Sequence, residues 1–404
     1  MATGSDDNTH RVAVKERAAT VEPALGIIGR AAGLRAEEAS SVAFMKIAFI
    51  RVHKDPAKGQ GGSAAKESSS SKSIIAELER RGIASGCEEW RFSAAASNGS
   101  EGGGLLGVRS FAVDSDGRSG ELQHYITTAG APHVVWVEGS HAPNYLRQAF
   151  ELCERSLKIV YSKDWKPQKI EGLPSYAVCL VDEAWQAEKL RRQGVRAAVW
   201  DKLIDYETAH WPIACEKRYD ICYVAYLRRR KNHELLFRSM AKLRERALRC
   251  VCVGGDPDGR LGELQQLAGE LRVVVDFAGD VTKAEVNRYV NESRIGVICS
   301  REDAAPRALL EYMAADVPVL VNAELLAGVR YVGPRAGLVR TPDEFHLGIA
   351  ELLDSVEQYA PRAHLIEHFS RDRVIETFAG ILRDAAAASG KELALGALST
   401  PGAR

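Results

Sequence analysis

The sequence predicts an α/β protein built from two tandem Rossmann-like, doubly wound lobes that face each other across a cleft. The chain has 404 residues, enough for two or three domains of ordinary size. Its 46% hydrophobic and 27% charged residues are typical of soluble globular proteins. From Met45 onward, short β-branched runs alternate with longer amphipathic ones, and the alternation restarts after Trp211-Pro212. This pattern predicts two parallel sheets, each covered by helices on both faces.

The first lobe is predicted from apolar runs of strand length and from amphipathic segments between them. The strand candidates are residues 46–52, 106–113, 133–137, 157–161, 176–180 and 197–200. The helix candidates are residues 73–81, 143–155 and 183–193. The last of these ends at Gly194, a residue suited to a left-handed C-cap. The Gly/Ser-rich residues 93–104 are typical of a mobile surface loop.

The second lobe repeats the same alternation. Its strand candidates are residues 220–225, 248–253, 273–277, 295–300 and 318–321. Its helix candidates are residues 234–244, 261–270, 283–291 and 306–315, and further helical segments follow at 343–353 and 371–387.

These elements divide the chain into four parts. Residues 1–44 are expected to be an N-terminal extension, either helical or flexible. Residues 45–210 form the first lobe and residues 211–370 the second. Residues 371–404 are expected to hold a C-terminal helix, which packs back toward the first lobe, and a tail.

Charge and cysteine content exclude several classes of protein. The 54 Lys and Arg balance the 54 Asp and Glu, so no global positive field exists to bind nucleic acid. The eight cysteines are scattered, without a C-x-x-C pair, which favours buried thiols in a reducing compartment. No apolar run approaches the roughly 20 residues of a membrane span, and no signal-peptide pattern opens the chain. We therefore expect a cytoplasmic protein, with peripheral contact at the inner face of a membrane left open.

The predicted cleft is the expected ligand site, because open α/β sheets bind ligands at the carboxyl ends of their strands. Gly61 and Gly62 lie in Gly59-Gln-Gly-Gly-Ser, which follows the first strand and precedes a helix. Such a loop suits the close approach of a phosphate or substrate, and a plain connection is the alternative. A G-x-G-x-x-G match at residues 102–107 leads into a strand, the wrong context for a dinucleotide site.

Residues 300–321 combine a strand exit, an acidic loop, a helix start and the next strand. Pro306 suits the first helical position, and the next amides, of Arg307 and Ala308, then have no acceptor within the helix at its positive end. This arrangement favours an anionic group such as a diphosphate. Glu311 could reach a ribose diol, and Asp303 could accept from a sugar hydroxyl. The alternative is that both acids only cap and solvate the helix.

The same residues resemble the signature of glycosyltransferase family 4 and its GT-B relatives, S-x-x-E-G-x-P-x-x-L-L-E-A-M-A-x-G-x-P-V. Asp303 stands at the first Glu of this pattern and Glu311 at the second. The run Y-V-A-Y-L-R-R-R-K-N-H, from Tyr223, resembles the opening of the family's donor lobe. Three further stretches are in register, residues 203–208, 251–256 and 276–281, and they include Gly254 and Gly279. Before Trp200 the likeness is only architectural.

The resemblance implies a nucleotide-sugar donor in the second lobe, an acceptor in the first lobe, and transfer with retention and without a metal or cofactor. In the family an Arg, a Lys and helix-end amides neutralise the leaving diphosphate. Lys231 matches the Lys, whereas Tyr226 stands at the Arg position. Arg228, with its neighbours 229 and 230, could replace that Arg or could be a solvated loop charge.

Further departures from the pattern lie near the acids. Ala304 replaces a Gly, and Asp303 is shorter than Glu by one methylene, which fits a different donor sugar. Asp316 replaces the Gly of the M-A-x-G run, at a turn where Asp tolerates a left-handed conformation better than most residues.

The acceptor side is less defined. Trp136-Val-Glu-Gly-Ser-His-Ala-Pro resembles the family's loop H-x-H-E-x-x-A-P without its first His residues. Glu138 and His141 in this loop, and His53 after the first strand, are candidates to assist the acceptor hydroxyl. A structural role is the alternative for each of them.

The sequence therefore predicts a retaining, metal-independent glycosyltransferase that moves a sugar from a nucleotide diphosphate to a hydroxyl acceptor, on a glycan, lipid or small molecule. The catalytic candidates are Lys231, Asp303, Glu138 and His141. A catalytically silent GT-B protein that binds or scaffolds is the main alternative. A non-transferring GT-B enzyme such as an epimerase would need its own acid/base set, and none is located. The nucleobase, sugar, acceptor and oligomeric state stay open.

Overall fold

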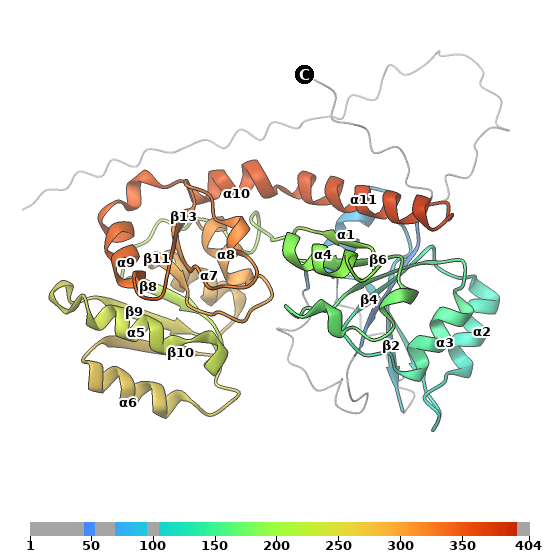
Figure 1. Ribbon diagram of the computed structural model, residues 1–404, viewed down its shortest axis with the longest axis horizontal. Helices are drawn as coiled ribbons and strands as arrows, with labels where there is room; N and C mark the ends of the chain where they lie inside the picture. Colours follow the sequence, from blue (N-terminus) through green and yellow to red (C-terminus); the bar gives the residue numbers. More distant parts are fainter. Residues whose placement is uncertain (1–43, 53–68, 95–104, 394–404) are drawn as a thin grey trace, which may run out of the picture. The chain divides into compact units, whose positions relative to one another are not determined.

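The computed structural model describes residues 44–52, 69–94 and 105–393 (Figure 1). All of these lie in one compact unit, Ala43–Arg404. Except for Phe44, the expected N-terminal extension falls outside the described residues, as do His53, Gly61 and Gly62.

The first lobe is built on a seven-stranded parallel sheet with the order β3-β2-β1-β4-β5-β6-β7. Its strands are β1 (Ile47–Arg51), β2 (Glu88–Ser93), β3 (Gly107–Ala112), β4 (Val134–Glu138), β5 (Leu157–Tyr161), β6 (Val178–Val181) and β7 (Ala197–Val199). Its helices are α1 (Ser70–Arg80), α2 (Gly120–Ala129), α3 (Asn144–Leu152) and α4 (Ala184–Arg191). The order reverses direction between β1 and β4, which leaves a crevice at their carboxyl ends.

The second lobe is built on a six-stranded parallel sheet with the order β10-β9-β8-β11-β12-β13. Its strands are β8 (Tyr219–Val224), β9 (Arg249–Val253), β10 (Val274–Gly279), β11 (Ser293–Ile298), β12 (Val319–Asn322) and β13 (Gly337–Arg340). Its helices are α5 (His233–Ala241), α6 (Leu261–Leu271), α7 (Lys283–Asn291), α8 (Arg307–Ala314), α9 (Phe345–Asp354) and α10 (Pro361–Phe369). Here the order reverses between β8 and β11.

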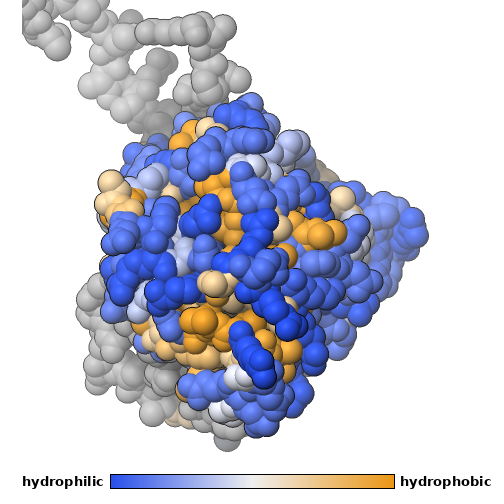
Figure 2. All heavy atoms as spheres, turned by 90° about the vertical axis from the view of Figure 1, so that its left-hand side faces the viewer, coloured by the Kyte–Doolittle hydropathy of each residue, from blue (hydrophilic) through white to orange (hydrophobic). Residues whose placement is uncertain are grey.

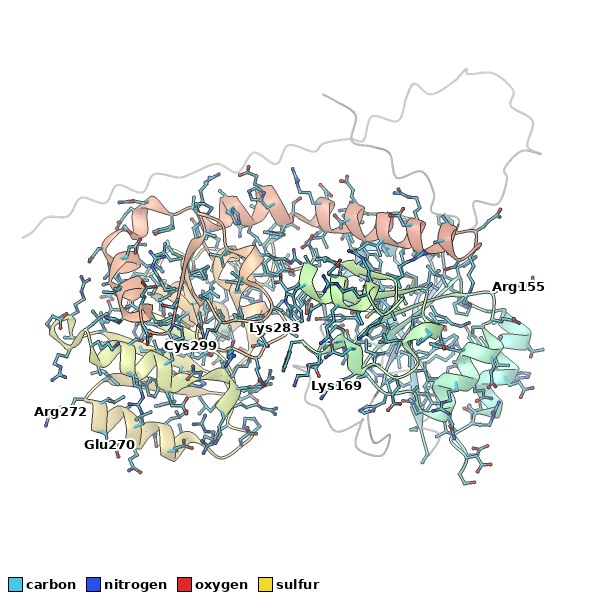
Figure 3. All side chains as sticks on the ribbon, viewed as in Figure 1. Arg155, Lys169, Glu270, Arg272, Lys283 and Cys299 are labelled. Atoms are coloured by element: carbon cyan, nitrogen blue, oxygen red, sulfur yellow. The ribbon has the colours of Figure 1, made fainter. Side chains whose placement is uncertain are left out.

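Burial on both faces explains why the central strands are apolar throughout. All five residues of β4 are buried, and β4 pairs in register with β1 through Ala48 and Val135. Alternate residues of β4 enter two different cores, one on each face of the sheet. Parallel sheets covered on both faces have this pattern. Charged side chains such as Arg155, Glu270 and Arg272 are exposed, whereas Cys299 is buried in the second lobe (Figure 3).

Helix α11 (Arg371–Ala388) follows the second lobe in the chain but completes the core of the first. Its Phe378 ring stacks on Trp136 at a centroid distance of 4.7 Å. Val374, Ile375 and Leu382 from the same helix are also buried in that core. The last helix therefore belongs to the first lobe by packing.

Side chains of the first lobe contact backbone and side-chain groups of the second. Trp185 Nε1 donates to Leu326 O at 2.9 Å, and Glu183 Oε1 accepts from Gly328 N at 2.6 Å. Arg330 Nη1 pairs with Asp201 Oδ1 at 2.6 Å. These contacts hold the segment before and within the 3-10 turn Val329–Tyr331 against the end of the first lobe.

The outer surface of the second lobe is a mixture of apolar and polar side chains. Figure 2 faces this lobe and shows apolar side chains in small patches separated by polar ones. Among the described residues, Val274 and Leu347 are exposed large hydrophobic residues of this lobe. In the part of the chain that the structure describes, no helix combines the length and apolar character of a membrane span.

The predicted fold class is confirmed, as are the strands predicted for both lobes. The sequence prediction missed strands β2 and β13 and helices α2 and α10. It assigned Pro306 to the first helical residue, whereas Pro306 is the N-cap and α8 begins at Arg307. Asp316 has φ 60°, which confirms the expected left-handed turn residue.

Candidate functional site

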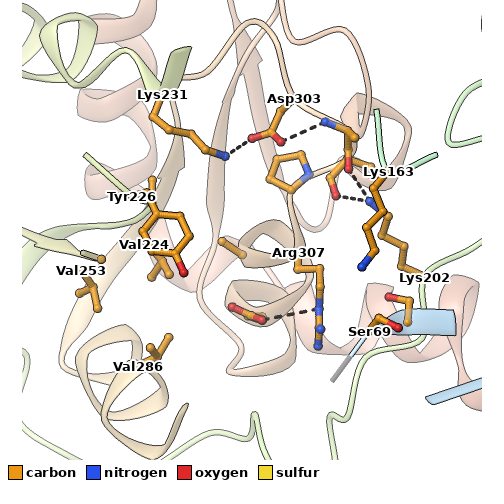
Figure 4. A pocket seen from close by; sticks show the side chains of 18 of the residues that line it. Ser69, Lys163, Lys202, Val224, Tyr226, Lys231, Val253, Val286, Asp303 and Arg307 are labelled. Atoms are coloured by element: carbon orange, nitrogen blue, oxygen red, sulfur yellow. Dashed lines mark hydrogen bonds and ion pairs between the residues drawn. The ribbon is translucent and has the colours of Figure 1, made fainter. Parts of the chain in front are cut away.

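A cavity of about 570 Å³ is lined by residues of both lobes (Figure 4). Most of its lining residues follow the carboxyl ends of strands or begin a helix. From the first lobe come Ser69, Ser70, Glu138, Tyr161, Lys163 and Lys202. From the second lobe come Val224, Ala225, Tyr226, Arg230, Lys231, Val253, Gly254, Asp280, Val281, Val286, Asp303, Ala304, Ala305, Pro306, Arg307, Ala308 and Glu311. Its position at the strand ends is where doubly wound sheets bind ligands.

Gly254 allows the ends of β8 and β9 to approach each other at the cavity. Its φ is +151°, and a Cβ at this position would lie 2.3 Å from Ala225 O. Only glycine fits such a conformation and contact. Since Ala225 N also donates to Val253 O at 2.9 Å, the turn that carries Tyr226 into the cavity is fixed from both sides.

Lys231 and Asp303 form an ion pair on the wall of the cavity (Figure 4). Lys231 ends the short 3-10 helix Arg229–Lys231 after β8, and Asp303 lies in the loop after β11. Burial by itself would raise the Asp303 pKa, but the charge and hydrogen bond of Lys231, with Arg230 and Lys202 nearby, lower it below its ordinary value. Asp303 is therefore ionised at neutral pH.

The loop from Asp303 to Pro306 directs the amino end of α8 into the cavity. Asp303 Oδ1 accepts from Ala304 N at 3.0 Å, and Ala305 has φ 46°, a left-handed conformation unusual for alanine. From the first lobe, the buried Lys202 donates to Ala304 O and, at 2.7 Å, to Ala305 O. The carbonyl groups of the loop thus face a buried cation, while Arg307 and Ala308 begin the helix beside the cavity.

Glu311 lies one turn into α8 and lines the cavity. Its Oε1 lies 3.7 Å from His210 Nε2 and 4.0 Å from Arg307 Nε. Burial lowers the His210 pKa, although the charge of Glu311 opposes this effect. With His210 neutral, the Glu311 carboxylate keeps its capacity to accept hydrogen bonds from a ligand.

The first-lobe wall contains a buried carboxylate between two cations. Glu138 is 1% exposed and accepts from Arg51 Nε at 3.0 Å and from Ser71 Oγ at 2.7 Å. It also pairs with Lys163. Burial would raise the Glu138 pKa, but the charges of Lys163 and Arg51 keep it below its ordinary value. Glu138 is an ionised acceptor with several partners, which makes it a weak base.

The structure brings most of the predicted site residues together. Those that line the cavity are Glu138, Lys231, Gly254, Asp303, Arg307, Ala308 and Glu311. Three others do not line it. His141 lies with its Nδ1 3.5 Å from Glu171 Oε1, Arg228 Nε lies 3.8 Å from Asp258 Oδ1, and Gly279 O accepts from Gly254 N at 2.9 Å. Of the three neighbouring arginines, it is Arg230 that lines the cavity.

Sequence reasoning missed several first-lobe residues of the cavity. Lys163 and Lys202 each follow a predicted strand by a few residues, and Ser70 begins the first helix. The sequence feature that could have identified them as cavity residues is their position directly after a strand end or at a helix start. Among the described residues, no group of three or more His, Cys, Asp or Glu side chains is arranged to hold a metal ion.

Comparison with known families adds a match in the second lobe. Residues 218–355 match the model of the family described as glycosyl transferases group 1. This range contains Lys231, Asp303 and Glu311, which meet at the cavity.

Among curated proteins, the chain is similar to two eukaryotic enzymes named GDP-Man:Man(3)GlcNAc(2)-PP-Dol alpha-1,2-mannosyltransferase. The protein from Xenopus laevis is 26% identical over 155 residues, which cover 36% of this chain and 30% of the relative. That from Dictyostelium discoideum is 28% identical over 172 residues, which cover 39% of this chain and 31% of the relative. The chain thus spans less than a third of the length of these relatives.

Solved structures share the arrangement of both lobes. Sucrose-phosphate synthase from Thermosynechococcus elongatus matches with a TM-score of 0.65 at 16% identity, covering 85% of this chain and 100% of the other. HepE from Anabaena, in complex with UDP and glucose, matches with a TM-score of 0.64 at 15% identity, covering 84% and 100%. These similarities show the fold. The described chain has the GT-B fold, and residues 218–355 of its second lobe match the model of the glycosyl transferases group 1 family.

Proposed function

We propose that this protein is a glycosyltransferase that moves a sugar from a nucleotide diphosphate to a hydroxyl acceptor, with retention and without a metal ion. One observation carries the proposal. Lys231, Asp303 and the amino end of α8 meet on one wall of a cavity between two GT-B lobes.

In the proposed complex, the donor diphosphate lies at the first amides of α8 and beside Lys231. The first amides of a helix have no partner within the helix, and the helix dipole places partial positive charge there. Charge that develops on the leaving phosphate oxygen would be stabilised by these groups without reorganisation. Glu311 would accept from the ribose hydroxyls, and Asp303 from a hydroxyl of the donor sugar.

Arg230 is the best candidate for the second cation that Tyr226 does not supply. It lines the cavity, and its Nη1 lies 3.7 Å from Asp303 Oδ1. Arg228 lies beside Asp258 and does not line the cavity. The proposal therefore replaces Arg228 by Arg230 as the residue that supports Lys231.

The relatives support a nucleotide-diphosphate sugar as donor. The names of the curated relatives specify GDP-mannose, and HepE was solved with UDP and glucose. Since these two nucleobases differ, the base that this chain binds is a matter for experiment. A cytoplasmic location also stays a prediction.

A thermal-shift screen with UDP, GDP, ADP and dTDP tests donor binding. A nucleotide that binds only the folded state raises the apparent stability by an amount set by its concentration relative to Kd. We expect one nucleotide to raise Tm clearly, and the variants K231M and E311A to lose most of this shift. A control variant, K189M, changes an exposed lysine of α4 and should keep it. Equal shifts in all four proteins would contradict the assigned site.

Activity assays test the reaction itself. With the donor sugar identified, K231M should lower the rate of transfer by about 10²- to 10³-fold, because a preorganised charge contact is lost. Transfer should persist in EDTA, and the anomeric configuration of the product should match that of the donor. Loss of activity in EDTA with recovery on added Mg²⁺ or Mn²⁺ would contradict metal independence.

A catalytically silent nucleotide-binding protein is the second candidate. Two observations favour it, because Tyr226 stands where the resemblance implies an Arg, and Lys231 is already paired with Asp303. Calorimetry separates the two candidates. Tight nucleotide binding without donor breakdown in the presence of varied acceptors supports the silent protein, and donor breakdown supports the transferase.

A further inference from the structure

The first-lobe wall of the cavity carries a second helix start. Helix α1, of 11 residues, begins at Ser70, and Ser69 is its N-cap, with Oγ accepting from Lys72 N at 3.2 Å. Both Ser69 and Ser70 line the cavity. The partial positive charge of this helix end therefore faces the same space as that of α8, from the opposite lobe.

Ser70 supplies an independent sign of a ligand. It is 7% exposed, and within the described ranges its buried hydroxyl has no hydrogen-bond partner. Buried hydroxyl groups are nearly always hydrogen-bonded, so an orphan at a cavity wall needs an explanation. A bound acceptor oxygen would satisfy it, and the orientation of a helix start favours an anionic one.

Lys163 adds a charge to this wall. It follows β5 with φ 58°, a left-handed conformation unusual for lysine, and its side chain is 44% exposed in the cavity wall. Strained backbone at a cavity persists where the surroundings hold it, and it is common at ligand sites. Lys163 pairs with Glu138, a carboxylate that Arg51 also contacts. The Lys163 ammonium group therefore shares the negative charge of Glu138 with Arg51, and it can still attract an anion.

We propose that Ser69, Ser70 and Lys163 bind a phosphate group carried by the acceptor. The inference rests on the proposed function, in which the donor diphosphate occupies the second-lobe wall at α8 and Lys231. An acceptor held on the first-lobe wall then meets a helix start, an unpaired hydroxyl and an ammonium group. A phosphate monoester or a diphosphate ester next to the accepting hydroxyl fits this chemistry, whereas a neutral sugar would leave the positive charge of the wall unused.

Calorimetry with inorganic phosphate and inorganic pyrophosphate tests the subsite. The protein is first saturated with the nucleotide that gives the largest thermal shift, so that the donor wall is occupied. We expect pyrophosphate or phosphate to bind this complex, and S70A and K163M each to weaken that binding by about tenfold or more. Preference for pyrophosphate indicates a diphosphate ester as acceptor, and preference for phosphate indicates a monoester.

Matched variants separate local from general effects. S73A removes a hydroxyl from the same helix outside the cavity, and K189M removes an exposed lysine, so neither should change anion binding. K163R keeps the charge and should retain more binding than K163M. Because S70A removes only one oxygen atom, it tests the subsite even if K163M fails to fold.

Three outcomes decide the matter. Displacement of the nucleotide by pyrophosphate would overturn the proposal, because the anion would then share the donor wall. Unchanged anion binding in S70A and K163M would overturn it as well. If pyrophosphate binds through Ser70 and Lys163 while no nucleotide binds at all, the subsite stands and the proposed transferase function fails.

Discussion

At the scale of single residues, two positions near the cavity have roles that follow directly from their surroundings. Gly254 keeps the ends of β8 and β9 in contact, and His233 begins α5 with its ring fully buried. Neither residue contacts a ligand in our proposal. Both residues nevertheless fix the position of the segment that carries Lys231.

Substitution of Gly254 by alanine should destabilise the protein by more than about 2 kcal/mol, because the new Cβ would lie 2.3 Å from Ala225 O and φ is +151°. Urea unfolding measures the change. Gly380, inside α11, has open space where a Cβ would lie, so G380A should instead stabilise the protein by about 0.5–1 kcal/mol. A stable G254A protein with unchanged nucleotide binding would show that the strand ends can separate without cost.

His233 should make stability depend on pH. Burial, with the charges of Arg260 and Lys231, lowers its pKa to about 3. The unfolded chain titrates near pH 6.5, so between these values the unfolded state binds more protons and stability falls as pH falls. The loss approaches about 1.4 kcal/mol per pH unit. This loss of stability is absent at pH values above the pKa of His233 in the unfolded chain.

The variant H233F removes this titration and keeps a ring against Tyr223, whose centroid lies 4.7 Å away. Between pH 7 and pH 5, wild type should lose about 2 kcal/mol more stability than H233F. The comparison with H233F removes the contributions of other buried histidines such as His210 and His364. Parallel pH curves for the two proteins would show that His233 accepts a proton without unfolding.

Residue positions were predictable from the sequence where one continuous motif contains them. Asp303, Arg307, Ala308 and Glu311 lie within nine residues of one strand–loop–helix unit, so their spacing alone places them together. Ser70 and Lys163 come from separate strand–helix units of a lobe with only architectural likeness to the family. Tertiary topology, which no local spacing encodes, brings them to the cavity.

At the scale of elements, the junction of β8, β11 and α8 organises the second lobe. Tyr312 of α8 is fully buried, and its hydroxyl accepts from Val224 N at 2.6 Å and donates to Cys222 O at 3.2 Å. Gly296 of β11 makes room for the ring, since a Cβ there would lie 2.4 Å from it. One phenol thus fastens the end of β8 to the helix whose start faces the cavity.

The variant Y312F should lower the free energy of unfolding by about 1–3 kcal/mol, because the part-buried amide of Val224 and the buried carbonyl of Cys222 each lose a hydrogen-bond partner. Hydrogen exchange should also be faster at the amide of Val224 than in wild type. Amides in the middle of β4, in the other lobe, serve as an internal control. Unchanged exchange at Val224 would mean that another group takes over the hydrogen bond.

Elements missed by the sequence prediction have physical reasons for their weak signals. β2 contains Glu88, Glu89 and Arg91, and charged residues in such a run are typical of a loop. In the fold, Glu89 pairs with Lys72 of α1 at 2.5 Å, and Glu88 pairs with Arg109 of the neighbouring strand. These charges become compatible with a strand only through partners that are remote in sequence. By contrast, the strands buried on both faces are apolar throughout and were found.

At the scale of the whole molecule, Lys202 joins the two lobes at the cavity. Its ammonium group lies between Asp182 Oδ1, at 3.4 Å, and the carbonyl groups of Ala304 and Ala305. Tyr161 Oη donates to the same aspartate at 3.1 Å. A first-lobe side chain therefore supports the loop that orients Asp303 and α8, so the donor wall depends on both lobes.

The variant K202M should weaken binding of the preferred nucleotide by tenfold or more, because the loop at Ala305 loses the cation that holds its carbonyl groups. Leaving Asp182 buried without its cation should also cost stability, and urea unfolding of the same variant measures that loss. Nucleotide affinity of the folded variant, measured by calorimetry, separates the two effects. If K202M binds the nucleotide as wild type does, the loop is rigid without help from the first lobe.

The packing of α11 has a consequence for synthesis on the ribosome. The first lobe is translated first, yet Val374, Phe378 and Leu382 enter its core only after the second lobe has been made. Until then Trp136 and Trp200 lack the ring that covers them. The nascent first lobe therefore keeps an apolar surface exposed until the second lobe and α11 have been synthesised. Of the two lobes, the second is the one that can finish folding during translation.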